Sequence, residues 1–137
     1  MADIRPFRCM HPSDGNFEKV AALPYDVYNR DEAKEEVKGK PCSFLNIDRP
    51  DSQYPAGTDI YADCVYDKAR ELFEGFIEKG LLCEEEKAYF YIYTLTMDGR
   101  EQNGIVACSS VDDYLDGTIK KHEFTLAEKE LDRIRHV

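Results

Sequence analysis

The segment Ala88–Ser109, AYFYIYTLTMDGREQNGIVACS, predicts a β-hairpin and sets the fold class. Aromatic and β-branched residues fill its first half up to Met97, and the dipeptide Asp98-Gly99 separates that run from the second one. Asp-Gly tolerates the positive φ angles that a two-residue hairpin turn requires. We therefore expect two antiparallel strands that turn at Asp98-Gly99, with Gly104 as a candidate bulge position in the second strand.

The aromatic run of this hairpin has two interpretations. Tyr89, Phe90, Tyr91 and Tyr93 are residue types that stack on bases in RNA-binding sheets. Basic residues, which accompany that role, are missing from the run. The composition therefore favours packing of the aromatic side chains in a protein core and on the face of a sheet.

Two helices are predicted upstream of the hairpin. The longer one extends from about Asp59, after a capping Thr58, to Lys79, and Phe73, Phe76 and Ile77 fall on one of its faces. We expect this face to pack against the hairpin sheet. The shorter helix spans residues 30–38, because Asn29 and Glu32 have the spacing of a capping box and Gly39 follows.

The remaining segments complete a mixed α/β pattern. Residues 4–8 are extended, residues 43–48 are predicted to form a strand, and residues 49–57 form a loop with two prolines. Thr125 and Glu128 predict a second capping box and a final helix that runs to Val137. Because no repeat or linker divides the sequence, we expect residues 1–137 to form a single α/β domain. No capping residue follows the last helix, so we also expect the chain to be the N-terminal portion of a longer protein.

Composition excludes several classes of function. Apolar residues make up 42% and charged residues 34% of the 137, which is typical of a globular protein. The formal net charge of −10 argues against nucleic-acid binding, which needs a basic face. No apolar run is long enough to span a membrane, and the N-terminus lacks a signal-peptide core. Five widely spaced cysteines indicate reduced, mostly buried thiols in a cytoplasmic protein.

No recognised metal or nucleotide motif is present in the sequence. His122-Glu123 resembles the start of a zinc-protease motif, but Leu126 occupies the position of the second histidine. His11 and His136 are isolated from other ligand residues. The glycine patterns of dinucleotide-binding folds and P-loops are also missing. We therefore predict no metal-ligand set.

Two short segments remain as candidate sites, each with a plain structural alternative. His122 and Glu123 follow two lysines and precede a helix N-terminus, where free N–H groups favour anions. The alternative is an ordinary helix cap between solvated charges. Asp26, at the end of an apolar run, is either a general base or a metal-phosphate ligand. Its alternative is a turn residue that bonds its own backbone.

Four segments in order carry a family resemblance. They are Arg5-Pro6-Phe7, Pro24-Tyr25-Asp26-Val27, His122-Glu123-Phe124-Thr125, and Lys129 followed by Asp132-Arg133. Together they resemble the bacterial and archaeal family called "domain of unknown function 1015", over essentially the whole chain. The layout is more distantly similar to the ParB/sulfiredoxin-type fold, a mixed sheet with an antiparallel hairpin and flanking helices.

The resemblance to that fold implies a function. It implies phosphate binding by His122, Thr125, Lys129 and Arg133, with ATP or ADP and magnesium as cofactors. By similarity to free-serine kinases, the reaction would be phosphoryl transfer to a small hydroxylated metabolite. Asp26 would act as the catalytic base, with Glu123 as a second candidate or as a magnesium ligand. The alternatives are a non-catalytic nucleotide-binding regulator and a structural or interaction domain.

Overall fold

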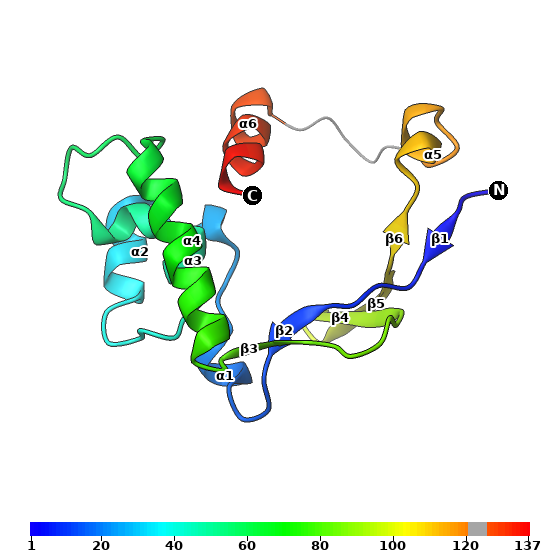
Figure 1. Cartoon of the computed structure of the whole chain (residues 1–137), viewed down its shortest axis with the longest axis horizontal. Helices are drawn as coiled ribbons and strands as arrows, with labels where there is room; N and C mark the ends of the chain where they lie inside the picture. Colours follow the sequence, from blue (N-terminus) through cyan, green and yellow to red (C-terminus); the bar gives the residue numbers. More distant parts are fainter. Residues whose placement is uncertain (121–125) are drawn as a thin grey trace. The chain divides into compact units, whose positions relative to one another are not determined.

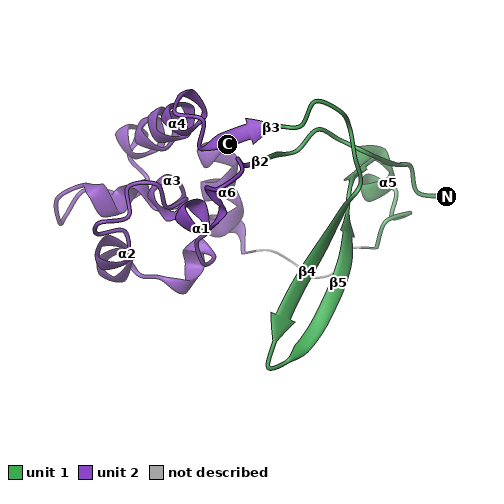
Figure 2. Ribbon diagram, turned by 90° about the horizontal axis from the view of Figure 1, so that it is seen from below, with its two compact units in different colours: residues 1–10, 84–125 green, residues 11–83, 126–137 purple. Residues whose placement is uncertain are grey.

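The computed structural model describes residues 1–120 and 126–137, and it confirms the mixed α/β class (Figure 1). The described chain divides into two compact units, coloured separately in Figure 2. The first comprises residues 1–10 and 84–125, and the second comprises residues 11–83 and 126–137. The boundary falls within two short paired strands, β2 (Met10–Pro12) and β3 (Leu82–Glu84). Each unit is described by itself.

The first unit contains the predicted hairpin. Strands β4 (Tyr91–Met97) and β5 (Arg100–Val106) pair antiparallel, and Asp98 and Gly99 both have positive φ angles, 51° and 76°. This is the backbone of a type I′ turn, as predicted from the dipeptide. Gly104 lies opposite Tyr93 in an uninterrupted register, so the predicted bulge is wrong.

The hairpin side chains are not packed in a core. Ile92 is 80% exposed, and Tyr93 and Leu95 are also exposed. Within the described chain, the expected packing of this aromatic run therefore holds for Tyr91, whose ring lies 5.1 Å from that of Phe7, but not for Phe90 and Tyr93, which are exposed. Strands β1 (Ile4–Arg5) and β6 (Cys108–Ser109) form a second antiparallel pair, and the short helix α5 (Val111–Leu115) follows β6.

The second unit is mostly helical and carries the hydrophobic core. Its elements are α1 (Phe17–Val20), the 3₁₀ turn η1 (Tyr25–Val27), α2 (Arg30–Glu36), α3 (Leu45–Asp48), the 3₁₀ turn η2 (Pro50–Gln53), α4 (Asp63–Glu78) and α6 (Ala127–His136). The buried cluster consists of Val20, Ile47, Phe76 and Leu82. It joins α1, α3, α4 and β3, and α3 lies against α4 (Figure 1).

Helix α2 begins as the sequence predicts. The Asn29 side chain accepts a hydrogen bond from the Glu32 N–H at 3.0 Å, and the Glu32 carboxylate accepts one from the Asn29 N–H at 2.8 Å. This reciprocal capping satisfies two N–H groups of the first turn. The helix ends at Glu36, two residues earlier than predicted.

The segment predicted as a strand at residues 43–48 is instead the short helix α3. The buried Asn46 amide donates to the carbonyl oxygens of Lys40 and Ser43, both at 2.9 Å, and so closes a tight turn. Ile47 is buried in the core, and Phe44, three residues earlier, packs against that core. A short apolar run has this ambiguity between helix and strand, and here tertiary packing decides for the helix.

Helix α4 starts four residues later than predicted. The Asp59 carboxylate accepts from the Tyr61 N–H at 3.0 Å, and the Ala62 N–H donates to the Asp59 carbonyl at 3.1 Å. These bonds form a turn that competes with the helix, as aspartate side chains commonly do. The prediction of an apolar face on α4 is partly correct. Phe76 is buried and Phe73 packs on the core of the second unit, but Ile77 is exposed.

Two further predictions concern the state of the cysteines and the absence of a membrane-spanning segment. All five cysteines are free, as expected, but none is fully buried, and Cys64 and Cys108 are exposed. Within residues 1–120 and 126–137, no helix combines the length and apolar character that crossing a membrane requires.

Replacing Phe76 should test the core directly. Because its ring is only 2% exposed, Phe76→Ala should lower the free energy of unfolding by about 3–5 kcal/mol in urea titration. Ile77→Ala, one residue along the same helix at a 40% exposed position, serves as the control and should cost less than about 1 kcal/mol. Equal losses for the two variants would contradict this placement of the core.

Candidate functional site

The buried Asp51 and the partly buried Arg49 form a bidentate ion pair beside the Pro24–Val27 segment. Arg49 Nε and Nη2 donate to the two carboxylate oxygens of Asp51 at 2.9 and 3.0 Å, and Asp51 is only 4% exposed. Arg49 Nη1 also donates to the carbonyl oxygens of Tyr25, at 3.4 Å, and Tyr28. The hydrogen bonds that Arg49 donates to Asp51 raise the pKa of its guanidinium. One side chain thus holds the backbone on both sides of Asp26.

Helix α6 is attached to the same region through its polar side chains. Asp132 accepts hydrogen bonds from the Tyr66 hydroxyl and from Arg133 Nη2, each at 2.9 Å. Arg133 Nη1 lies 3.6 Å from an Asp48 carboxylate oxygen. The Arg133 guanidinium carbon also lies 4.0 Å from the centre of the Tyr25 ring, a cation–π contact. Arg133 therefore connects α6 with both α3 and η1.

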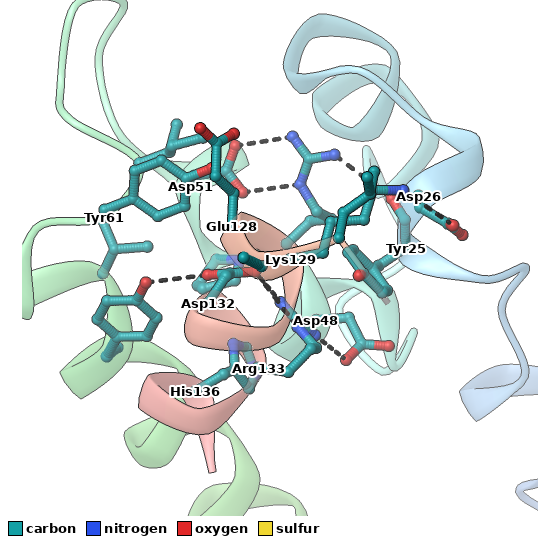
Figure 3. A pocket seen from close by; sticks show the side chains of 17 residues that line it. Tyr25, Asp26, Asp48, Asp51, Tyr61, Glu128, Lys129, Asp132, Arg133 and His136 are labelled. Atoms are coloured by element: carbon teal, nitrogen blue, oxygen red, sulfur yellow. Dashed lines mark hydrogen bonds and ion pairs between the residues drawn. The ribbon is translucent and has the colours of Figure 1, made fainter. Parts of the chain in front are cut away.

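These side chains surround a pocket of about 500 Å³ within the second unit (Figure 3). Its walls come from η1, the α3–η2 segment, the residues from Ile60 to Tyr66, and α6. The polar side chains in its lining are Tyr25, Asp26, Asp48, Arg49, Asp51, Tyr61, Tyr66, Glu128, Lys129, Asp132, Arg133 and His136. A cavity of this size accommodates a small molecule of metabolite or nucleotide dimensions.

Burial and hydrogen bonding shift several pKa values in this pocket. Burial raises the pKa of Asp48, although Arg133 and His136 oppose the shift. Burial also acts to raise the pKa of Asp132, but hydrogen bonds from Arg133 and Tyr66 outweigh it and lower that pKa below its usual value. Burial lowers the pKa of His136, so its neutral imidazole is favoured at neutral pH. Burial and the bond to Asp132 raise the pKa of Tyr66 to about 12.

The pocket brings three of the sequence-predicted site residues together. Lys129 Nζ lies 3.6 Å from Asp26 Oδ2, and both side chains are about half exposed, at 55% and 47%. Arg133 lines the same pocket, with its guanidinium on Tyr25. These residues come from segments about one hundred positions apart in the sequence.

The other predicted residues of the motif, His122, Glu123 and Thr125, lie outside the described residues. Helix α6 has Leu126 as its N-cap and begins at Ala127, one residue later than a Thr125 cap would place it. Within the described chain, no side chain donates or accepts a capping hydrogen bond at this end. The first N–H groups of the helix therefore lack a described side-chain partner.

The arrangement is not a preformed metal site. Among the described residues, no group of three or more metal-ligating side chains has the geometry to hold a metal ion. Among the described residues, five carboxylates line the pocket against three permanently positive side chains, Arg49, Lys129 and Arg133. This surplus of negative charge fits a magnesium ion that arrives with a phosphate ligand, since Mg²⁺ in nucleotide sites is held by one or two carboxylates together with phosphate oxygens.

Several pocket residues could not be recognised from the sequence. The sequence predicts a loop at Arg49 and Asp51 and a strand at Asp48, and it offers no partner for His136. Tyr28, whose carbonyl accepts from Arg49, is 21 positions away in the sequence. The one available signal was local: an arginine two positions before an aspartate in a proline-containing loop allows a bidentate pair.

Comparison with known families supports the resemblance noted from the motifs. A family model described as "Protein of unknown function (DUF1015)" matches residues 4–137. The chain belongs to the DUF1015 family. Comparisons with curated proteins and with solved structures found no significant match. The more distant similarity to the ParB/sulfiredoxin-type fold therefore stays a prediction for this DUF1015 chain.

The Arg49–Asp51 pair should be essential to stability. Asp51→Asn would leave the Arg49 charge buried without its anionic partner, and we expect a loss of about 3–5 kcal/mol in the free energy of unfolding. Asp67→Asn, which removes an exposed partner of Arg70 on α4, is the matched control and should change stability by less than about 1 kcal/mol. A loss for Asp51→Asn no greater than the control would contradict a buried pair.

His136 should make the stability of the second unit depend on pH. Because the folded-state pKa of His136 is lowered below 6.5, the unfolded chain binds its proton more readily between that lowered value and 6.5. The stability that the folded state gains from a neutral His136 is therefore fully present above about pH 6.5 and decreases as the pH falls. Thermal melts at pH 7.5 and 5.5 should show a larger loss for the wild type than for His136→Gln. A parallel response of both proteins would contradict the shift.

Proposed function

We propose that the pocket binds a nucleotide together with Mg²⁺ and supports phosphoryl transfer to a small hydroxylated metabolite. The observation that carries the proposal is the pair formed by Asp26 and Lys129, which lie 3.6 Å apart at the pocket and remain about half exposed. A carboxylate and an ammonium group so placed can reach a bound ligand. Phosphoryl transfer needs both groups, one for the acceptor proton and one for the phosphate charge.

The roles of the two side chains follow from their chemistry. The Lys129 ammonium offers three donors and a positive charge to phosphate oxygens. The Asp26 carboxylate is the group that accepts the proton of the acceptor hydroxyl as it attacks. Their proximity brings the hydroxyl and the transferred phosphoryl group to one place, which is the main requirement of this reaction.

Helix α6 contributes a second feature that supports phosphate binding. It is ten residues long, and its first-turn N–H groups have no capping side chain among the described residues. Such groups, with the positive end of the helix dipole, favour phosphate. Thr125 and His122 precede this turn in the sequence and are proposed as further phosphate ligands, with Glu123 as a second candidate for the base or for a magnesium ligand.

The negative charge of the pocket gives magnesium a defined role in nucleotide binding. A free nucleotide would bring several negative charges to a pocket in whose described lining carboxylates already outnumber permanent cations by five to three. Bound Mg²⁺ supplies positive charge that compensates the phosphates. Asp26 lies beside Lys129, and Asp48 and Asp132 lie beside Arg133, so these three carboxylates are near the proposed phosphate position.

Nucleotide binding can be tested by thermal shift. The full-length protein should gain stability with ATP or ADP in the presence of magnesium, because a ligand that binds only the folded state raises the melting temperature. The same nucleotides with a chelator should give a much smaller shift. Binding that is equally strong without magnesium would contradict the charge argument, and the absence of any shift at millimolar nucleotide would reject the proposal.

Catalysis requires a separate measurement. Asp26→Asn should lower phosphoryl transfer to the acceptor about 10²–10⁴-fold while leaving nucleotide affinity nearly unchanged, since the base acts in the chemical step. Lys129→Met should instead weaken nucleotide binding, and His122→Ala is expected to weaken it as well. Asp14→Asn, an exposed turn position in the same unit, is the matched control and should change neither quantity. Unchanged turnover in Asp26→Asn would reject Asp26 as the base, and nucleotide binding without turnover of any hydroxylated acceptor would favour a regulator.

A further inference from the structure

A second cavity, of about 560 Å³, lies between helices α3, α4 and α6 of the same unit. Its apolar lining comes from Phe44, Ile47, Ala69 and Phe73, of which Ile47 and Ala69 are buried. Ile47 belongs to the hydrophobic core, and Phe44 and Phe73 pack against that core. The cavity thus has a floor that the fold already holds rigid, which suits the apolar part of a ligand.

Three arginines are among the described residues that line this cavity, Arg70, Arg133 and Arg135. Each of them has an ion-pair partner, which is Asp67 for Arg70, Asp132 for Arg133 and Asp63 for Arg135. The chain as a whole carries a formal charge of −10, and the first pocket has a surplus of carboxylates. Arginine is the residue type that suits planar, bidentate recognition of a carboxylate, so this lining offers donors to a ligand anion that takes the place of an aspartate.

The arginines at the edge of the cavity are available to a ligand. Arg70 contacts Asp67 at 3.0 Å, and Arg135 contacts Asp63 at 2.9 Å, but all four side chains are about half exposed or more. Exposed pairs of this kind are weak, because water solvates both partners. A ligand carboxylate can replace either aspartate as the partner of its arginine and form a bidentate contact, while the displaced aspartate returns to solvent.

We propose that this cavity is a second binding site, for a small molecule with an aromatic or branched apolar body and one carboxylate. The apolar body lies on Phe44, Ile47, Ala69 and Phe73, and the carboxylate contacts Arg70 or Arg135. This site goes beyond the proposed phosphoryl transfer. It is separate from the Asp26–Lys129 pair, which does not line it, but it shares Asp48, Tyr66, Arg133 and His136 with the first pocket.

The two parts of the proposal can be separated with a matched pair of probes. Isothermal titration calorimetry should be run with 1-naphthaleneacetate and with its neutral amide, which have the same apolar body. The acid should bind about tenfold more tightly than the amide, because it alone forms a charge-assisted contact with an arginine. The double variant Arg70→Gln/Arg135→Gln should reduce binding of the acid to the level of the amide and leave the amide unchanged. These substitutions are at exposed positions, so the variant is expected to fold, and its circular dichroism spectrum verifies this.

Three controls assign the signal to this cavity. Arg100→Gln removes an exposed arginine from the hairpin, and Ile92→Ser removes an exposed apolar side chain there; neither should alter binding of the acid. Asp26→Asn in the first pocket should also leave it unchanged, so failure of this proposal is distinguishable from failure of the kinase proposal. Equal affinity for acid and amide, no effect of the double arginine variant, weaker binding in Ile92→Ser, or no binding of either probe would overturn the proposal.

Discussion

The buried pair of Arg49 and Asp51 is the constraint on which the candidate site depends. An aspartate that is 4% exposed is stable only with a cation and hydrogen bonds around it, since the cost of removing a lone charge from water is large. Arg49 supplies both, and its remaining donors bind the carbonyl oxygens that flank Asp26. The burial of one carboxylate therefore fixes the position of a segment more than twenty residues away.

Helix α6 completes the site by contacts of a different kind. It reaches η1, α3 and α4 through Lys129, Asp132 and Arg133, which form ion pairs, hydrogen bonds and one cation–π contact. Tyr25 is central to this arrangement, because its carbonyl accepts from Arg49 while its ring carries Arg133. The shared motif Pro24-Tyr25-Asp26-Val27 thus has a structural role in Tyr25 and a proposed chemical role in Asp26. The two pockets, one rich in carboxylates and one in arginines, meet at the side chain of Arg133.

Local rules predicted those parts of the fold that depend on local interactions. The hairpin turn follows from Asp98-Gly99, and the start of α2 follows from Asn29 and Glu32, since in both cases the residues satisfy or shape their own backbone. The segment that became α3 was predicted wrongly, because the partners that close it include the Lys40 carbonyl and the core around Phe76.

The candidate site shows the same division between local and distant information. Asp26, Lys129 and Arg133 were selected by motif resemblance, and the structure places them around one pocket. The sequence does not single out Arg49 and His136, because only folding brings them near Tyr25, Tyr28 and Asp48. Asp51 differs, since its partner Arg49 is two positions away. Spacing in the sequence cannot report a contact between a loop arginine and carbonyl groups 21 to 24 residues earlier.

The attachment of α6 has a consequence for the conditions under which the pocket exists. Leu131 and Ile134 on this helix are exposed, and its described contacts with the rest of the unit are mainly between charged or polar groups. Attractions between partly exposed charges weaken as mobile ions screen them, with a screening distance that falls from about 8 Å at physiological ionic strength to about 3 Å at 1 M salt. Helix α6 should therefore loosen at high ionic strength well before the apolar core around Phe76 unfolds. In that state the chain would keep its hydrophobic cluster, but both cavities would lose the wall that α6 provides. Salt would therefore weaken ligand binding by loosening this helix, in addition to screening the charges of the ligand.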